Sequence, residues 1–119
     1  MTQRLRFLAR RFQVDHRPAV SVPPPGEEWL SIVRAPEGLT VVRAAGPGED
    51  QAWVALYSGD TAHDLDVPGM LAALLVPLRD AGVSVFVSST FHADVVLVPE
   101  DRRADAVTAL RAAGHEVTE

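Results

Sequence analysis

The turn that decides the fold reads Asp66-Val67-Pro68-Gly69-Met70-Leu71. It follows the strand-like stretch 53–58 and precedes an amphipathic stretch, 71–78, whose leucines recur at helical spacing. Proline and glycine at a strand-to-helix junction leave several backbone N–H groups free where the helix begins. Gly69 has no side chain to keep a ligand away from those groups. The turn therefore predicts a binding site for an anionic group such as a carboxylate.

A short internal repeat indicates two similar β-α-β halves. Residues 78–82 read Leu-Arg-Asp-Ala-Gly, residues 110–114 read Leu-Arg-Ala-Ala-Gly, and strand-like residues follow both. In each copy the glycine falls where a helix needs a left-handed residue after its last turn. The arginine lies in that last turn, where it complements the helix dipole. We expect two helices that end alike.

From Trp53 onward the pattern is strand, helix, strand, strand, helix, strand. Asp66 and Asp101 are placed to cap the two helices. The stretch 95–98 is apolar on both faces, which is typical of a central strand, so residues 1–48 or another subunit must cover the face that the helices leave open. Right-handed crossovers then give a ferredoxin-like, four-stranded antiparallel sheet with both helices on one face.

Residues 1–48 are predicted to form strands. Apolar and polar residues alternate in the two short stretches 4–7 and 12–14, which favours paired strands. The stretches 31–34 and 39–43 flank the turn Ala35-Pro36-Glu37-Gly38, which is typical of a hairpin. The stretch 44–51, with its Gly46-Pro47-Gly48, is the best boundary. The sequence thus predicts an α+β chain with a β-rich unit over residues 1–48 and a second domain over residues 52–118.

Composition excludes several classes of function. The net charge is −5, and the chain divides into a half of +3 (seven Arg, four acids in residues 1–48) and a half of −8 (four Arg, twelve acids in residues 49–119). Opposite charges favour docking of the two halves or of two subunits, and the acidic balance argues against nucleic acid. No apolar run is long enough for a membrane helix, so we expect a soluble protein. The lack of cysteine is compatible with a reducing cytosol, and we expect a cytoplasmic protein. Arginine without lysine suggests a GC-rich, bacterial genome.

The side chains that could act in catalysis do not occur in the sequence patterns of known catalytic sites. No serine lies in a nucleophile elbow or beside a persuasive base, and the four histidines lack metal-ligand spacing. We therefore expect no enzyme activity, no metal and no cofactor.

Three motifs together resemble the ACT domain, a small amino-acid-binding regulatory module with this topology. They are Asp66-x-Pro68-Gly69-x-Leu71, then residues 81–85 (Ala-Gly-Val-Ser-Val), then residues 94–100 (Asp-Val-Val-Leu-Val-Pro-Glu). The stretches 89–91 and 110–115 are similar to a narrower group, stand-alone bacterial proteins with two ACT-like units, related to the cytosolic arginine sensor of animals. That group has a helix between Arg43 and Trp53, where this chain has only nine residues, so the first unit is expected to be a truncated ACT-like unit.

The resemblance implies a function and a site. ACT domains bind effectors at the junction of two units, between the first strand-to-helix turn of one and the second-strand edge of the other. We expect a non-enzymatic, amino-acid-binding regulator, with the ligand held between two units in one chain or across a homodimer. The alternative is a structural or protein-interaction module that has the fold but no small ligand. The implied ligand-binding residues are Asp66, Val67, Pro68, Gly69, Met70, Leu71, Ser88, Ser89, Thr90 and Asp94.

Overall fold

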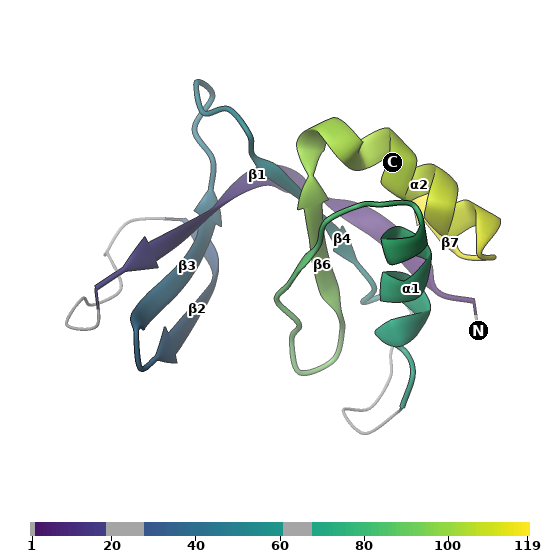
Figure 1. Ribbon diagram of the computed structural model, residues 1–119, viewed down its shortest axis with the longest axis horizontal. Coiled ribbons are helices and arrows are strands. Elements are labelled where there is room, and N and C mark those ends of the chain that lie inside the picture. The colour runs from purple at the N-terminus through teal and green to yellow at the C-terminus, as the bar shows by residue number, and fades with distance from the viewer. Residues whose placement is uncertain (1, 19–27, 61–67) are drawn as a thin grey trace.

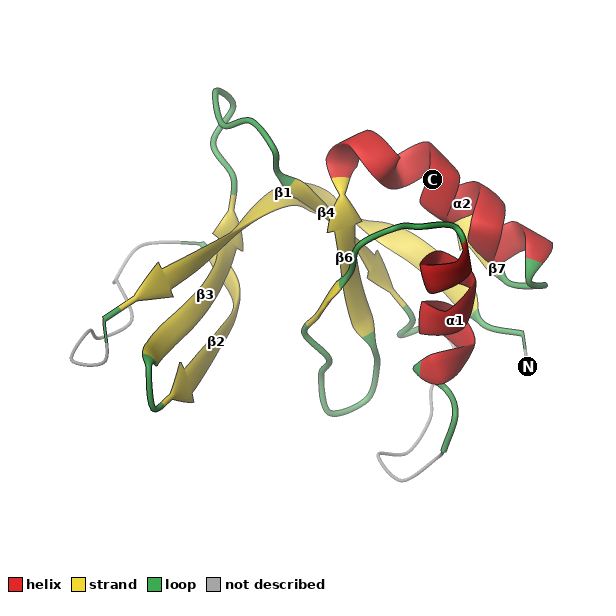
Figure 2. Ribbon diagram, in the orientation of Figure 1, coloured by secondary structure: helices red, strands yellow, loops and turns green. Residues whose placement is uncertain are grey.

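The computed structural model describes residues 2–18, 28–60 and 68–119 (Figure 1). In chain order the elements are β1 (Arg4–Arg17), β2 (Trp29–Ala35), β3 (Gly38–Ala44), β4 (Trp53–Tyr57), α1 (Ala72–Asp80), β5 (Phe86–Val87), β6 (Val95–Pro99), the 3-10 turn η1 (Glu100–Arg102), α2 (Arg103–Ala112) and β7 (Glu116–Thr118). The mixture of one curled sheet and two helices confirms the predicted α+β class (Figure 2).

The seven strands of the described chain form a single sheet in the order β2-β3-β1-β4-β6-β5, with β7 also paired to β1. β1 is antiparallel to β4 from Arg6 to Phe12 and antiparallel to β3 from Phe12 to Arg17. The register between β1 and β4 shifts between Phe7 and Arg11, which marks a bulge. One long strand thus joins the β2–β3 hairpin to the rest of the sheet.

The position of β1 differs from the expected four-stranded arrangement. β7 does not lie beside β4, because the N-terminal part of β1 lies between them and runs parallel to β7. Leu5 of β1 is 2% exposed and packs in the same apolar cluster as Val117 of β7, so burial of Leu5 accounts for the insertion. The two stretches expected as separate short strands are one strand of 14 residues. The division into units at 1–48 and 52–118 stays a prediction.

Two apolar clusters lie on opposite faces of β4 and β6. On one face, α1 and α2 supply Leu74, Leu78, Val107 and Leu110, which pack on the sheet. On the other face, Val95 and Leu97 pack against side chains of β1, β2 and β3. All four residues of the stretch 95–98 are buried. Two covers were predicted for the face that the helices leave open, residues 1–48 or another subunit, and the structure shows residues 1–48 there.

Both helices end as predicted. Gly82 (φ 72°) and Gly114 (φ 96°) adopt the left-handed conformation. After α1, the N–H of Val83 donates to the carbonyl of Leu78, and after α2 the N–H of His115 donates to the carbonyl of Leu110 (2.9 and 3.0 Å). These are the hydrogen bonds of a Schellman motif.

The predicted helix starts need correction. α2 begins at Arg103, because Glu100–Arg102 form a 3-10 turn, so Asp101 does not cap it. The N-cap position of α1 is Leu71, which makes no side-chain cap hydrogen bond, rather than Asp66, which lies outside the described residues.

Ion pairs join the basic and acidic halves, as the charge pattern predicted. In each pair an arginine from residues 1–48 contacts an acid from residues 49–119: Arg4 with Glu116, Arg6 with Asp60, Arg11 with Glu100, and Arg43 with Glu49.

Candidate functional site

The turn before α1 exposes backbone where the sequence predicted a ligand. Pro68 and Gly69 are exposed, Met70 is buried, and Gly69 has φ 83°. A Cβ added to Gly69 would meet no atom within 4 Å, so the space in front of this residue is open. Asp66 and Val67, which complete the predicted motif, lie outside the described residues.

The N–H groups at this turn have no internal partner in the part of the chain that is described. The hydrogen bonds of α1 begin with the N–H of Ala73, which donates to the carbonyl of Gly69 at 3.0 Å. Among the described residues, no acceptor pairs with the N–H groups of Met70, Leu71 and Ala72. Such groups carry the positive end of the helix dipole and favour an anionic ligand.

A buried polar cluster anchors this turn to the two ends of the chain. The side-chain Nε2 of Gln3 donates to the carbonyl of Met70 at 2.8 Å, and the backbone N–H of Gln3 donates to Nδ1 of His115 at 3.1 Å. Because Nδ1 accepts, the proton of neutral His115 lies on Nε2, which donates to the carbonyl of Ala73 at 2.9 Å. Gln3 is 0% exposed, and its Oε1 has no hydrogen-bond partner among the residues that the structure describes.

The second predicted group lies in the loop between β5 and β6. Ser89 Oγ donates to Asp94 Oδ1 at 2.9 Å, and Thr90 Oγ1 accepts from the N–H of Ala93 at 3.1 Å. The N–H of Asp94 donates to Oγ of the fully buried Ser58, which directly follows β4, at 2.8 Å. Asp94 is itself 7% exposed. These bonds fix the loop to the end of β4.

Ser88 connects the loop to the hairpin. Its N–H donates to the carbonyl of Val95 at 2.9 Å, and its Oγ lies 2.6 Å from Oγ of Ser31 in β2. The described site residues therefore form two groups, one at the turn before α1 and one in the β5–β6 loop. The first is held by Gln3 and the second by Ser31 and Ser58. Whether either group binds a ligand stays a prediction.

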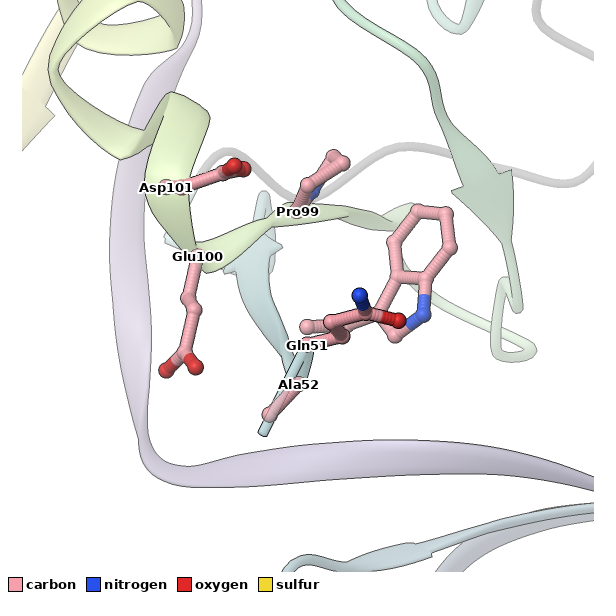
Figure 3. A pocket seen from close by; sticks show the side chains of 6 residues that line it. Gln51, Ala52, Pro99, Glu100 and Asp101 are labelled. Atoms are coloured by element: carbon pink, nitrogen blue, oxygen red, sulfur yellow. The ribbon is translucent and has the colours of Figure 1, made fainter. Parts of the chain in front are cut away.

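A pocket of about 490 Å³ lies at the other end of β4. It is lined by Gln51, Ala52, Trp53, Pro99, Glu100 and Asp101 (Figure 3). Since Trp53 begins β4 and Ser58 follows it, about 17 Å of strand separates this pocket from the β5–β6 loop. The sequence patterns placed Trp53 in a strand, Asp101 at a helix cap and Gln51 in a boundary, so the pocket was missed.

Two arginines hold the loop beside this pocket. Arg11 donates to both oxygens of Glu100 (2.7 and 3.0 Å) and to the carbonyl of Glu49 (2.7 Å). Arg43 donates to both oxygens of Glu49 and to Asp15. Hydrogen bonds from Arg11 lower the pKa of Glu100, and those from Arg43 lower the pKa of Glu49 to about 2.

Glu49 makes the fold sensitive to acid. A carboxyl whose pKa is lower in the folded chain stabilises the fold above its unfolded pKa and loses that contribution as pH falls through the folded value. For Glu49 this window runs from 4.5 down to about 2. We expect the free energy of unfolding, measured by urea denaturation at each pH, to fall across the window, and to fall less in Glu49→Gln. The same pH slope in both chains would contradict this assignment.

Neither a metal site nor a membrane-spanning helix is present among the described residues. No group of three or more His, Asp or Glu side chains there is placed to hold a metal ion. None of the described helices is long and apolar enough to span a membrane.

Comparison with known proteins identifies the fold. A family model described as the ACT domain matches residues 49–112. A crystal structure of an Agobacterium tumefaciens protein is similar at 22% identity, covering 99% of this chain and 93% of that one with a TM-score of 0.85. A Vibrio cholerae protein, described as of unknown function and as a possible transport protein, is similar at 22% identity, with 89% and 85% coverage and a TM-score of 0.73. At this identity the two structures show a shared fold alone. No curated protein matches the chain.

Proposed function

The chain belongs to the ACT domain family, and we propose that it is a non-enzymatic regulatory protein that binds an amino acid at the turn before α1. ACT domains generally bind amino acids in regulatory roles. The narrower resemblance, to stand-alone bacterial two-unit proteins related to the cytosolic arginine sensor, supports a bacterial, cytoplasmic protein of this type.

The observation that carries the proposal is the open backbone at residues 69–72. Its N–H groups suit the α-carboxylate of an amino acid, and Gly69 leaves room for the ligand to approach them. The buried side chain of Gln3 donates to the carbonyl of Met70, which fixes the position of the described part of the turn. A pre-ordered turn reduces the entropy cost of binding.

A second copy of the chain is the proposed source of the second unit. The hairpin of β2 and β3 covers the face of the sheet opposite α1, so it is not placed across from the turn. β5 ends the sheet and, among the described strands, pairs only with β6. Its outer edge therefore offers free backbone groups to a second copy. In such a homodimer, Ser88, Ser89, Thr90 and Asp94 of one copy would contribute to the ligand site of the other.

The ligand would act by selecting one arrangement of the two copies. An effector shifts a conformational equilibrium only by the difference in its affinity for the two states. A ligand held between two copies makes all of its contacts only when they are correctly placed. It would thereby favour that arrangement and add to the stability of the dimer.

Thermal unfolding in the presence of each of the twenty amino acids tests this function. A ligand at a hundred times its dissociation constant should stabilise the fold by about 2.7 kcal/mol. For a chain of this size we expect a rise in melting temperature of about 10 °C. Sedimentation with and without that amino acid should show the dimer. If none of the twenty raises the melting temperature, the interaction module without a small ligand is the better description.

A further inference from the structure

We propose that the pocket at the start of β4 is a second binding site, which takes a small organic cation such as an alkylammonium or alkylguanidinium ion. The pocket lies at the opposite end of β4 from the β5–β6 loop and shares no residue with the amino-acid site. Its volume of about 490 Å³ falls within the range of small-molecule sites in proteins.

The charge of the pocket favours a cation. Two of its lining residues, Glu100 and Asp101, carry carboxylates, and no lining residue is basic. Arg11 donates to both oxygens of Glu100, so this carboxylate is already neutralised. Asp101 makes no ion pair or hydrogen bond to the described residues, and it does not cap α2. One negative charge is therefore left for a ligand.

The two carboxylates point in different directions. Figure 3 shows the Glu100 side chain turned away from that of Asp101, whose carboxylate lies on the side of Pro99. Glu100 is held in this direction by Arg11 of β1. Asp101 is exposed, lines the pocket and makes no hydrogen bond that caps a helix. A cation in the pocket can therefore meet Asp101 without displacing Arg11.

Trp53 supplies the apolar wall that an organic cation needs. Its ring is half-buried and packs edge-to-face against Phe86, with 6.5 Å between ring centroids, which holds it in place. The face of an indole attracts cations, and Trp is the best side chain for this interaction. With Ala52 and Pro99 beside it, the pocket can also receive a short alkyl chain. A metal ion would gain nothing from this wall.

Gln51 places an amide at the same pocket. Its φ of 54° is the left-handed value that residues other than glycine rarely adopt. The conformation is held by the neighbouring loop, where Arg11 binds the carbonyls of Gly46 and Glu49. The side-chain oxygen of Gln51 can accept a hydrogen bond from an ammonium or guanidinium group.

Fluorescence of Trp53 tests the proposal. The chain has two tryptophans, so Trp29→Phe leaves Trp53 as the single reporter. We expect n-butylguanidinium to change its emission in a saturable manner with a dissociation constant of about 1 mM, as suits a ligand of this size. Butanol and butyrate carry the same apolar body without the positive charge, and they should bind at least about fivefold more weakly.

Two variants locate the cation. In the Trp29→Phe chain, Asp101→Asn should weaken binding about fivefold. Glu37→Gln removes an exposed charge from the β2–β3 turn, away from the pocket, and should leave binding unchanged. An equal response to butanol, or unchanged binding in Asp101→Asn, would overturn the proposal, as would the lack of any saturable response.

The probe separates this site from the amino-acid site. n-Butylguanidinium has no carboxylate, so it cannot bind as an anion to the N–H groups before α1, which have no acceptor among the described residues. Gly69→Val in the Trp29→Phe chain should therefore leave its binding unchanged. Loss of butylguanidinium binding in Gly69→Val would place the cation at the turn before α1 and overturn the separate site.

Discussion

Replacing His115 with alanine is expected to lower the free energy of unfolding by about 4 kcal/mol. The ring is 5% exposed and satisfies two backbone groups, the N–H of Gln3 and the carbonyl of Ala73. Each buried group left without a partner costs about 1–3 kcal/mol, and the missing ring leaves a cavity. Since β1, α1 and β7 meet at this ring, its loss should loosen the turn that is proposed to hold the ligand. Urea denaturation at neutral pH measures the effect.

The matched control is His16→Ala. His16 lies in β1 and is exposed, so the same substitution there should change the free energy of unfolding by no more than about 0.5 kcal/mol. Equal losses in the two variants would show that the buried hydrogen bonds of His115 do not stabilise the fold in the way described.

Replacing Gly69 with valine is expected to remove the whole response to the amino acid, about 2.7 kcal/mol at a hundred times the dissociation constant. The new side chain would project into the open space in front of the turn, where the ligand is proposed to approach. Valine at φ 83° also strains the backbone by more than about 1 kcal/mol, so the variant will melt at a lower temperature even without ligand.

Gly82→Val separates this strain from the loss of the site. Gly82 has φ 72° and open space around its Cβ position, so valine should be strained there to a similar degree. Gly82 follows α1 rather than preceding it. The Gly82→Val variant should therefore keep the full shift in melting temperature on addition of the amino acid. A shift that survives in Gly69→Val, or that is lost equally in both variants, would argue against a ligand at the turn.

Much of the fold could be predicted from local patterns. The two helix ends were predictable because a glycine after the last turn has a local physical cause, the left-handed conformation that Gly82 and Gly114 adopt. The doubly buried strand β6 was predictable because four consecutive apolar residues need cover on both faces. That need also indicated that residues 1–48 or another subunit would cover the sheet, and the structure shows residues 1–48 there.

The rest depends on contacts between residues far apart in the chain. Nothing near Leu5 in the sequence indicates that β1 lies between β4 and β7, because the pairing is set by a shared core with Val117. Asp101 has the residue type of a helix cap, but a 3-10 turn at the end of β6 takes its place before α2. The local capping rule therefore failed here, because neither the 3-10 turn nor α2 has a side-chain cap hydrogen bond.

The candidate site, too, was predictable only where it depends on residues close together in the sequence. The glycine turn before α1 was recognised from its own residues. The contact of Gln3 with His115 spans 112 positions of sequence and no local signal predicts it. The pocket was missed because Gln51, Trp53 and Asp101 come from two segments that only the pairing of β4 with β6 brings together.

An NMR titration of ¹⁵N-labelled protein tests the central claim most directly, with the amino acid that raises the melting temperature most as the ligand. We predict that the largest shifts of amide signals will fall on Gly69, Met70, Leu71 and Ala72, with smaller shifts in the β5–β6 loop. A titration that leaves these four signals unmoved and shifts the amides of Gln51, Ala52 and Trp53 would contradict the claim.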